Sequence, residues 1–158
     1  MQPAKLLLNK SRLRLLAVAL SAYIFFGHLL IPLRIQGRSM EPTYMDGGFN
    51  FCWRLHYLFS QPQRGDVVAI RFAGRRIMLL KRVVALAGET VEIRNGVLFV
   101  NTIQVNEPYV RYPSDWNLQP RQVASGKVYV IGDNRSVPID QHHFGQVTAR
   151  RIVGGVVW

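Results

Sequence analysis

Cysteine is almost absent from the sequence: Cys52 is the only one among 158 residues. A single cysteine excludes an intrachain disulfide even in an oxidising compartment, and its apolar neighbours predict a small packed side chain. His142 and His143 are adjacent, but no carboxylate or cysteine set stands at ligand spacing around them. We therefore expect no metal site and a chemistry that needs no cofactor.

Acidic residues are also scarce, since 9 aspartates and glutamates stand against 20 lysines and arginines, for a formal net charge of +11. Such an excess can indicate nucleic-acid binding. Here, however, the basic residues are spread along the chain and form neither a dense basic tract nor a recognisable nucleic-acid-binding motif. An anionic membrane surface is an equally good partner for them. We expect a lipid bilayer, with anionic lipids, as the partner and no nucleic acid.

A long apolar run is present near the N-terminus, from Leu15 to Leu33. At roughly 1.5 Å per residue, a helix of this length crosses about 30 Å of hydrocarbon. A cleavable signal peptide is the alternative, because small residues stand near Ala19, but its apolar core is usually only about 7–15 residues long. We predict a basic flank at 1–14, a transmembrane anchor helix at 15–34 and a second domain at 35–158.

The orientation of the anchor follows from its flanks. Lys5, Lys10, Arg12 and Arg14 precede the apolar run. An excess of positive charge marks the cytoplasmic side of a membrane span. We expect a cytoplasmic N-terminus and an extracytoplasmic second domain.

The remainder of the chain has the pattern of a mainly β fold, without internal repeats. Asn95-Gly96 separates two β-type runs and predicts a type I′ hairpin. Pro108, Pro113 and Pro120 interrupt the stretch 105–122, which we expect to be irregular. The predicted strands lie within Asp66 to Phe72, Arg76 to Leu86, Thr90 to Val100, Lys127 to Ile131, and Ile152 to Trp158.

Ser39 and Lys81 are a candidate nucleophile and its base. Ser39 lies in a loop with Gly37 and Pro42 soon after the apolar run, and Lys81 is embedded in an apolar strand. A serine hydroxyl needs a neighbour to take its proton, and burial can lower the lysine pKa of about 10.4 enough to leave that amine neutral. Alone, Ser39 is more typical of a turn and Lys81 of a snorkelling strand lysine. Together they predict nucleophilic catalysis.

Four stretches in this order resemble the type I signal peptidases, membrane-bound serine/lysine proteases that remove signal peptides from exported proteins. They are Gly37 to Thr43, Arg64 to Val68, Lys81 to Glu89, and Gly132 to Gly145. The resemblance covers almost the whole chain. It implies a signal-peptidase-like β-sheet catalytic domain in the bacterial inner membrane and preprotein substrates with small residues at the first and third positions before the cut.

The resemblance also implies roles for individual residues. Ser39 would be the nucleophile, with its backbone N–H donating to the oxyanion, and Lys81 the general base. Arg82 would pair with Asp133 and fix the strand that carries Lys81. Supporting positions are expected at Gly37, Met40, Pro42, Asn134, Arg135, Ser136 and Asp140.

Three positions depart from the family pattern. Gly37 lacks the serine hydroxyl that donates to the oxyanion in some bacterial members. Pro138 stands where the family usually has a serine that orients the lysine amine, and proline has no donor. We hypothesise that Ser136 replaces that serine. His142 replaces the usual arginine, so a salt bridge to Asp140 would depend on pH.

Three alternatives remain open at this point. A specialised peptidase that matures pilin or conjugation proteins fits the small size and the Pro138 loop. A self-cleaving serine/lysine repressor shares the chemistry but needs a DNA-binding region in place of 15–33. An inactive membrane-anchored scaffold is suggested by Pro138 and His142, whereas retention of Ser39 and Lys81 argues against it.

Overall fold

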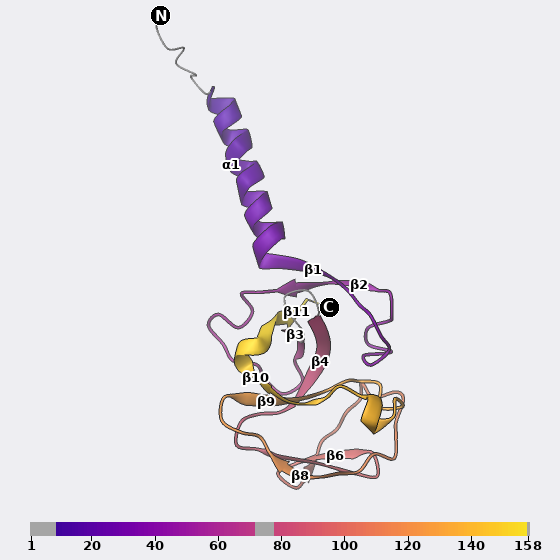
Figure 1. Cartoon of the computed structure of the whole chain (residues 1–158). Helices are drawn as coiled ribbons and strands as arrows, with labels where there is room; N and C mark the ends of the chain where they lie inside the picture. Colours follow the sequence, from indigo (N-terminus) through magenta and orange to yellow (C-terminus); the bar gives the residue numbers. More distant parts are fainter. Residues whose placement is uncertain (1–8, 72–77, 158) are drawn as a thin grey trace, which may run out of the picture.

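The fold consists of an N-terminal helix that projects from a mainly β domain (Figure 1). The computed structural model describes residues 9–71 and 78–157. Helix α1 (Lys10–Ile24) continues through η1 (Phe25–Leu29), a π-helical turn. The side chain of Asn9 caps α1 by accepting a hydrogen bond from the Ser11 N–H. Asparagine is among the residues preferred at this position, which explains why the helix begins before the apolar run.

The helix Lys10–Leu29 is long and apolar enough to cross a membrane. Its 20 residues rise by about 30 Å, the thickness of the hydrocarbon layer. None of the residues of α1 is buried against the domain. Side chains such as Leu16, Val18 and Phe26 are more than half exposed. An apolar surface of this size needs a covering that the domain does not supply.

The anchor helix predicted at 15–34 is wrong at its C-terminal end. Residues Leu30–Arg34 form strand β1, which pairs antiparallel with β2 (Phe49–Trp53). Pro32 explains the change, because proline disfavours helical backbone at the preceding residue and lacks an N–H for the helix ladder. β1 is an edge strand, where a missing donor is tolerated.

Within the described residues, the larger sheet has seven antiparallel strands in the order β1-β2-β11-β3-β4-β9-β10. The structure confirms four predicted strands of this sheet in their described parts: Asp66 to Phe72, Arg76 to Leu86, Lys127 to Ile131 and Ile152 to Trp158. Phe72, Arg76 and Trp158 themselves lie outside the described residues. The further strands of this sheet are β3 (Val67–Arg71), β4 (Met78–Ala85), β9 (Lys127–Ile131), β10 (Gly145–Thr148) and β11 (Ile152–Val156).

The smaller sheet has the order β7-β6-β5-β8. It consists of β5 (Thr90–Arg94), β6 (Val97–Val100), β7 (Ile103–Gln104) and β8 (Leu118–Gln122). The predicted hairpin is confirmed, because Asn95 (φ 46°) and Gly96 (φ 80°) both have the positive φ that a type I′ turn requires. The prediction of irregular structure up to residue 122 is wrong for β8, an edge strand that tolerates Pro120.

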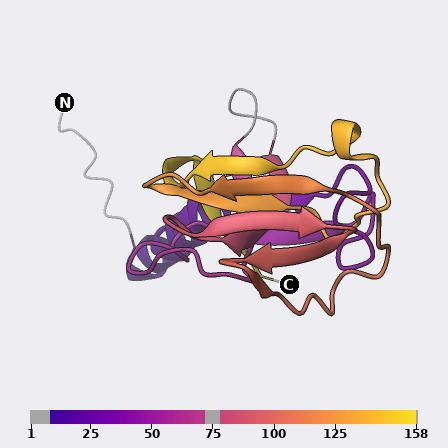
Figure 2. The same ribbon diagram turned by 90° about the horizontal axis from the view of Figure 1, so that it is seen from below.

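The main core lies between the two sheets. Seen from below, the smaller sheet is in front and the helix lies behind the domain (Figure 2). Val84 and Ile131 of the larger sheet pack with Ile93 and Leu98 of the smaller one, and Tyr129 joins them. Val84 and Ala85 at the end of β4 are therefore fixed in the core. This holds Lys81 and Arg82, which precede them in the same strand, in place.

Candidate active site

Ser39 and Lys81 lie in direct contact although they are 42 residues apart, with Lys81 Nζ 2.7 Å from Ser39 Oγ. Ser39 belongs to a tight turn after β1, closed by hydrogen bonds from the Glu41 N–H to the Arg38 carbonyl and from the Tyr44 N–H to the Met40 carbonyl. Lys81 is a residue of β4. The two side chains that the sequence singled out are thus brought within hydrogen-bond reach.

Lys81 is buried, with 3% of its surface exposed. Burial lowers its pKa from 10.5 to about 8, and the nearby Asp133 carboxylate opposes this shift. The cause is that a low-dielectric surrounding disfavours the ammonium form. A substantial fraction of Lys81 is therefore neutral at mildly alkaline pH and able to accept a proton.

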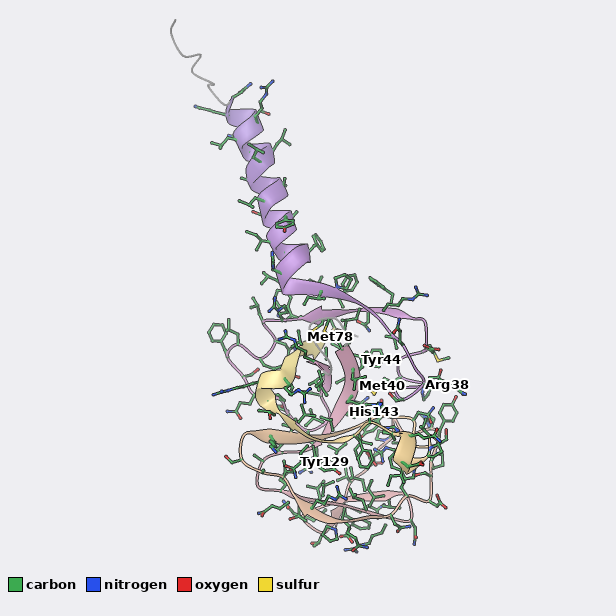
Figure 3. The ribbon with its side chains drawn as sticks, viewed as in Figure 1. Arg38, Met40, Tyr44, Met78, Tyr129 and His143 are labelled. Carbon is green, nitrogen blue, oxygen red and sulfur yellow. The ribbon has the colours of Figure 1, made fainter. Side chains whose placement is uncertain are left out.

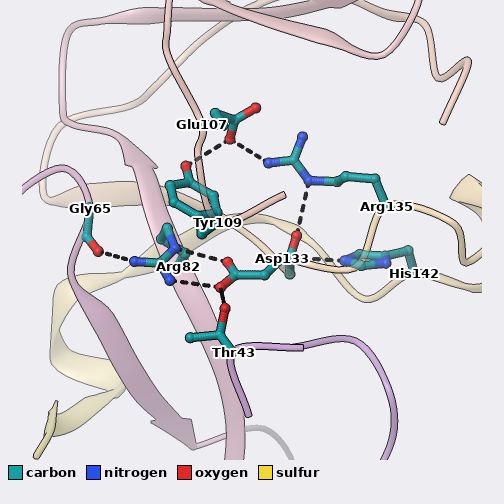
Figure 4. Close-up of polar contacts among 9 residues, drawn as sticks. Thr43, Gly65, Arg82, Glu107, Tyr109, Asp133, Arg135 and His142 are labelled. Carbon is teal, nitrogen blue, oxygen red and sulfur yellow. Dashed lines mark hydrogen bonds and ion pairs between the residues drawn. The ribbon is translucent and has the colours of Figure 1, made fainter. Parts of the chain in front are cut away.

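Arg82 forms the ion pair with Asp133 that was expected. Its Nε donates to Asp133 Oδ1 at 2.8 Å and its Nη2 to Oδ2 at 2.6 Å, while Nη1 donates to the Gly65 carbonyl at 2.6 Å (Figure 4). The Thr43 hydroxyl also donates to Asp133 Oδ2, at 2.6 Å. Both oxygens of the fully buried Asp133 carboxylate are satisfied. This pair joins β4, the loop after β9 and the turn that carries Ser39.

The loop after β9 also holds the Ser39 turn through Asn134. The Asn134 N–H donates to the Ser39 carbonyl at 3.0 Å, and its side-chain Nδ2 donates to the Arg38 carbonyl at 3.0 Å. Gly132 is required in this loop, because a Cβ there would lie 2.2 Å from the Ser39 carbonyl oxygen. The close approach of the two backbones leaves no space for a side chain.

The hypothesis that Ser136 orients Lys81 is wrong. The Ser136 hydroxyl donates to Asn134 Oδ1 at 2.7 Å, and its N–H donates to the same oxygen at 3.0 Å. Within the described part of the chain, Ser39 is the only hydrogen-bond partner of the Lys81 amine. Ser136 therefore fixes the side chain of Asn134, and acts on the Ser39 turn only through it.

Glu107 and Tyr109 are the residues that sequence reasoning missed. Arg135, with 1% of its surface exposed, donates through Nη2 to Glu107 Oε1 at 2.5 Å and through Nε to the Gly132 carbonyl at 2.9 Å. The Tyr109 hydroxyl donates to the same Glu107 oxygen at 2.7 Å, and its ring lies 3.9 Å from the Arg82 guanidinium (Figure 4). The one available signal was that Glu107 is an acidic residue in a chain with few of them.

His142 is buried and neutral. Its Nε2 accepts a hydrogen bond from the Gly132 N–H at 3.0 Å. Burial, followed by the charge of Lys81 and that of Arg135, lowers the pKa of His142 to about 3. Asp140 is exposed on the turn η2 (Ile139–Gln141), and no ion pair joins it to His142 among the described residues. The salt bridge considered for these two residues is therefore absent, and Asp140 is not brought to the Ser39–Lys81 pair.

The remaining predicted positions shape the turn around Ser39. Gly37 adopts φ +89°, and its N–H donates to Asp46 Oδ1 at 2.8 Å. Met40 is 2% exposed and points inward beside β4, while Arg38 lies on the outer side (Figure 3). Pro42 follows Glu41 through a cis peptide bond. The Ser39 N–H donates no backbone hydrogen bond within residues 9–71 and 78–157.

A cavity of about 290 Å³ lies beside Ser39. One wall is the stretch Pro32–Gly37, and the other is formed by Met78, Leu79 and Leu80 of β4. β4 pairs with β3 from Met78 onward, but its pairing with β9 begins only at Arg82. In the described residues, the second edge of 78–81 is thus unpaired. An extended peptide can add to such an edge through backbone hydrogen bonds.

Comparison with known proteins gives a consistent match. The family model described as signal peptidase, peptidase S26, matches residues 8–158. Thylakoidal processing peptidase 1 of Arabidopsis thaliana is 34% identical over 148 residues, covering 85% of this chain but 43% of that protein. Signal peptidase I V of Bacillus subtilis is 31% identical over 140 residues, 80% of this chain and 83% of that protein. Probable signal peptidase I-1 of Synechocystis is 32% identical over 154 residues, 92% of this chain and 79% of that protein.

A solved structure is also similar. The crystal structure of a signal peptidase I from Enterococcus faecalis superposes with a TM-score of 0.51 at 29% identity. The match covers 61% of this chain and 97% of that one. The chain spans less than half of the plant relative and about four-fifths of the two bacterial ones.

Proposed function

The chain belongs to the signal peptidase family of serine endopeptidases, peptidase S26, and on this premise we propose that it removes signal peptides from exported preproteins through a Ser39–Lys81 dyad. The observation that carries the proposal is the 2.7 Å separation of Lys81 Nζ and Ser39 Oγ. A buried amine with a lowered pKa next to a hydroxyl has the arrangement of an activated nucleophile.

The proposed reaction proceeds through an acyl-enzyme. Neutral Lys81 accepts the Ser39 proton as Oγ attacks the carbonyl carbon of the scissile bond. The negative charge that develops on the carbonyl oxygen is stabilised by the Ser39 N–H. Lys81 then gives its proton to the leaving amine, and the mature protein departs. A water that transfers its proton to Lys81 hydrolyses the ester and restores Ser39.

The tuning of the base in this proposal rests on burial. Pro138 donates nothing, Ser136 is bonded to Asn134, and His142 is neutral. The Lys81 amine is instead positioned by its fixed strand and by Ser39 itself. The Asp133 carboxylate keeps β4 and the Ser39 turn in fixed positions, because it accepts hydrogen bonds from Arg82 and from Thr43.

The proposed substrate lies as an extended strand along Met78–Leu80, opposite the stretch Pro32–Gly37. A cavity of about 290 Å³ between two largely apolar walls accommodates small side chains next to the scissile bond. This supports a preference for small residues at the first and third positions before the cut. A dedicated pilin or conjugation-protein peptidase would use the same site on a narrower set of substrates.

The proposed location is the bacterial inner membrane. The helix Lys10–Leu29 supports a single-pass anchor in place of 15–34, with the basic residues before it in the cytoplasm and the catalytic domain outside. The net charge of +11 supports anionic lipids as the neighbouring surface.

The test is cleavage of a preprotein by the detergent-solubilised full chain. We expect Ser39→Ala and Lys81→Ala each to lower kcat/KM by about a thousandfold or more, as for other catalytic units. Ser60→Ala and Lys127→Ala are matched controls, because both residues lie away from the cavity beside Ser39. Cleavage that survives Ser39→Ala would refute the mechanism. A wild type that cleaves only pilin-like substrates would select the dedicated peptidase, and one that cleaves no preprotein would favour the scaffold.

A further inference from the structure

A second groove lies on another part of the domain, away from the Ser39–Lys81 pair. It has a volume of about 890 Å³. One side is the segment after β2, and the other side is formed by the segments at the end of β4, the start of β9 and the start of β11. The half-buried apolar side chains of Leu86, Ile152 and Val153 line it together with Tyr57. The groove thus offers an apolar surface to a molecule that enters from outside.

The rim of this groove is cationic. Arg54, Lys127 and Arg150 line it, and no aspartate or glutamate is among its lining residues. No carboxylate lies within salt-bridge distance of any of the three in the described parts of the chain. Asp66 and Glu89 are the acidic residues nearest in sequence to the residues that line the groove, and both already have partners. Asp66 accepts a hydrogen bond from the Tyr57 hydroxyl at 2.9 Å, and Glu89 pairs with Arg64 at 2.5 Å. The site therefore has positive charge without a counterion from the protein.

The groove begins where the apolar helix ends. The Arg54 N–H donates to the Leu29 carbonyl at 2.9 Å, and its Nη1 donates to the His28 carbonyl at 3.3 Å. In the segment that follows Arg54, the side chains of Leu58 and Phe59 are 58% and 96% exposed. The segment after β2 and the turn η3 (Ala149–Arg151) lie on the same side of the domain below the helix (Figure 1). With the helix in a bilayer, this end of the groove lies at the lipid surface.

We propose that this groove binds the headgroup of an anionic phospholipid, with the phosphate between Arg54, Lys127 and Arg150 and the first part of an acyl chain against Leu58 and Leu86. A phosphate supplies the negative counter-charge that the protein does not provide for the three cations. The acyl chains of a diacyl lipid supply apolar surface that matches the groove walls. The inference rests on the membrane anchoring of the proposed function but not on its peptidase mechanism. Bound lipid would fix the orientation of the domain relative to the bilayer surface.

The test uses the detergent-solubilised full chain and native mass spectrometry with phosphatidylglycerol, with phosphatidylcholine as the uncharged comparison. We expect the wild type to retain phosphatidylglycerol in preference to phosphatidylcholine. The double variant Lys127→Glu/Arg150→Glu should bind phosphatidylglycerol at least tenfold more weakly, and Lys127→Gln/Arg150→Gln should show an intermediate loss. Arg94→Glu/Arg121→Glu carries the same change in net charge on the smaller sheet and should bind as the wild type does.

Equal retention by the two glutamate double variants would overturn the proposal, and so would equal retention of the two lipids by the wild type. Inorganic phosphate and glycerophosphoglycerol provide a further arm: displacement of phosphatidylglycerol by either at equal concentration would identify a soluble phosphate as the ligand and refute a lipid site. Preprotein cleavage in detergent is measured in parallel. Because the groove does not include Ser39 or Lys81, loss of lipid binding with cleavage intact separates this inference from the dyad mechanism.

Discussion

The Thr43 hydroxyl donates to Asp133 Oδ2 at 2.6 Å across 90 residues of sequence. Asp133 is the carboxylate that also receives two hydrogen bonds from Arg82. Thr43 lies in the turn that begins with Ser39, and Arg82 follows Lys81 directly. One buried carboxylate thus fixes the positions of the candidate nucleophile and the candidate base relative to each other.

Thr43→Val is expected to lower the free energy of unfolding by about 1–2 kcal/mol, because it removes a donor from a buried carboxylate. We also expect a lower kcat, since the Ser39 turn loses its link to Asp133. Thr43→Ser keeps the hydroxyl and is the matched control. The measurements are thermal unfolding of the solubilised full chain and preprotein cleavage; a valine variant equal to the serine variant in both would contradict the role of this contact.

The rate of cleavage should rise with pH through about 8, because Lys81 acts as a base only when neutral and its pKa is lowered to about 8. Below that pH the amine is protonated and kcat/KM falls tenfold per pH unit. A pH profile of kcat/KM measures this. A midpoint near the ordinary lysine value of 10.5 would show that burial does not tune the base.

Replacing Lys81 by methionine should abolish activity but stabilise the fold near neutral pH. The native pKa of Lys81 is below its unfolded value of 10.5, so the unfolded chain binds more protons between about pH 8 and 10.5 and the stability of the wild type rises across that window. At lower pH the full penalty of burying the ammonium remains, and we expect Lys81→Met to be more stable by about 1–3 kcal/mol. Denaturant unfolding of both proteins at about pH 7 and pH 10.5 should show a difference that shrinks as pH rises.

Glu107→Ala is expected to destabilise the protein by about 3 kcal/mol or more, because it leaves the buried guanidinium of Arg135 without its carboxylate. Glu107→Gln retains an oxygen that accepts from Arg135 and from the Tyr109 hydroxyl, so we expect a smaller loss. Tyr109→Phe removes only the hydroxyl and leaves the ring beside Arg82 in place. Thermal unfolding of the three variants should rank alanine lowest; equal effects of alanine and glutamine would indicate that the charge, rather than the hydrogen bonds, dominates.

His142 should make the protein acid-labile. Its native pKa of about 3 is below the unfolded value of 6.5, so its contribution is fully present above about pH 6.5 and is lost as pH falls towards 3. His142→Gln keeps an acceptor for the Gly132 N–H but does not titrate. We expect the difference in unfolding free energy between wild type and variant to change by about 2–4 kcal/mol over this window. A pH-independent difference would show that His142 titrates normally.

Local sequence signals predicted the hairpin at Asn95-Gly96 and most strands, because β-type runs and turn residues act over a few positions. They failed at Leu30–Arg34, where an apolar run continues without a break from helix into strand. Hydrophobicity alone cannot distinguish the two in short apolar runs. Pro32 was the available cue, and its effect on the preceding residue outweighs the continuity of the pattern.

The pairing of Ser39 and Lys81 was predictable for a different reason: each residue alone is ordinary in its setting, but a serine in a Gly- and Pro-bearing loop and a lysine in an apolar strand together indicate a nucleophile and a base. Glu107 and Tyr109 were not predictable, because their partners Arg135 and Arg82 are distant in sequence and the contacts depend on how the stretch after β7 packs under the loop after β9. The hypothesis that Ser136 takes the place of the missing serine was wrong for a local reason. The Asn134 side-chain oxygen, two residues away, accepts the hydrogen bond of the Ser136 hydroxyl.

The helix ends at Leu29 and β1 begins at Leu30, with no residue between them. Because the segment that continues β1 also forms a wall of the cavity beside Ser39, no separate loop lies between the helix and the strand that leads to this cavity. If the helix spans a bilayer, as we propose, the depth at which it lies fixes the distance of Ser39 from the lipid surface. A peptide bond would then have to emerge by that distance before Ser39 could reach it, and lengthening the helix by a few residues would move the site of cleavage along the substrate.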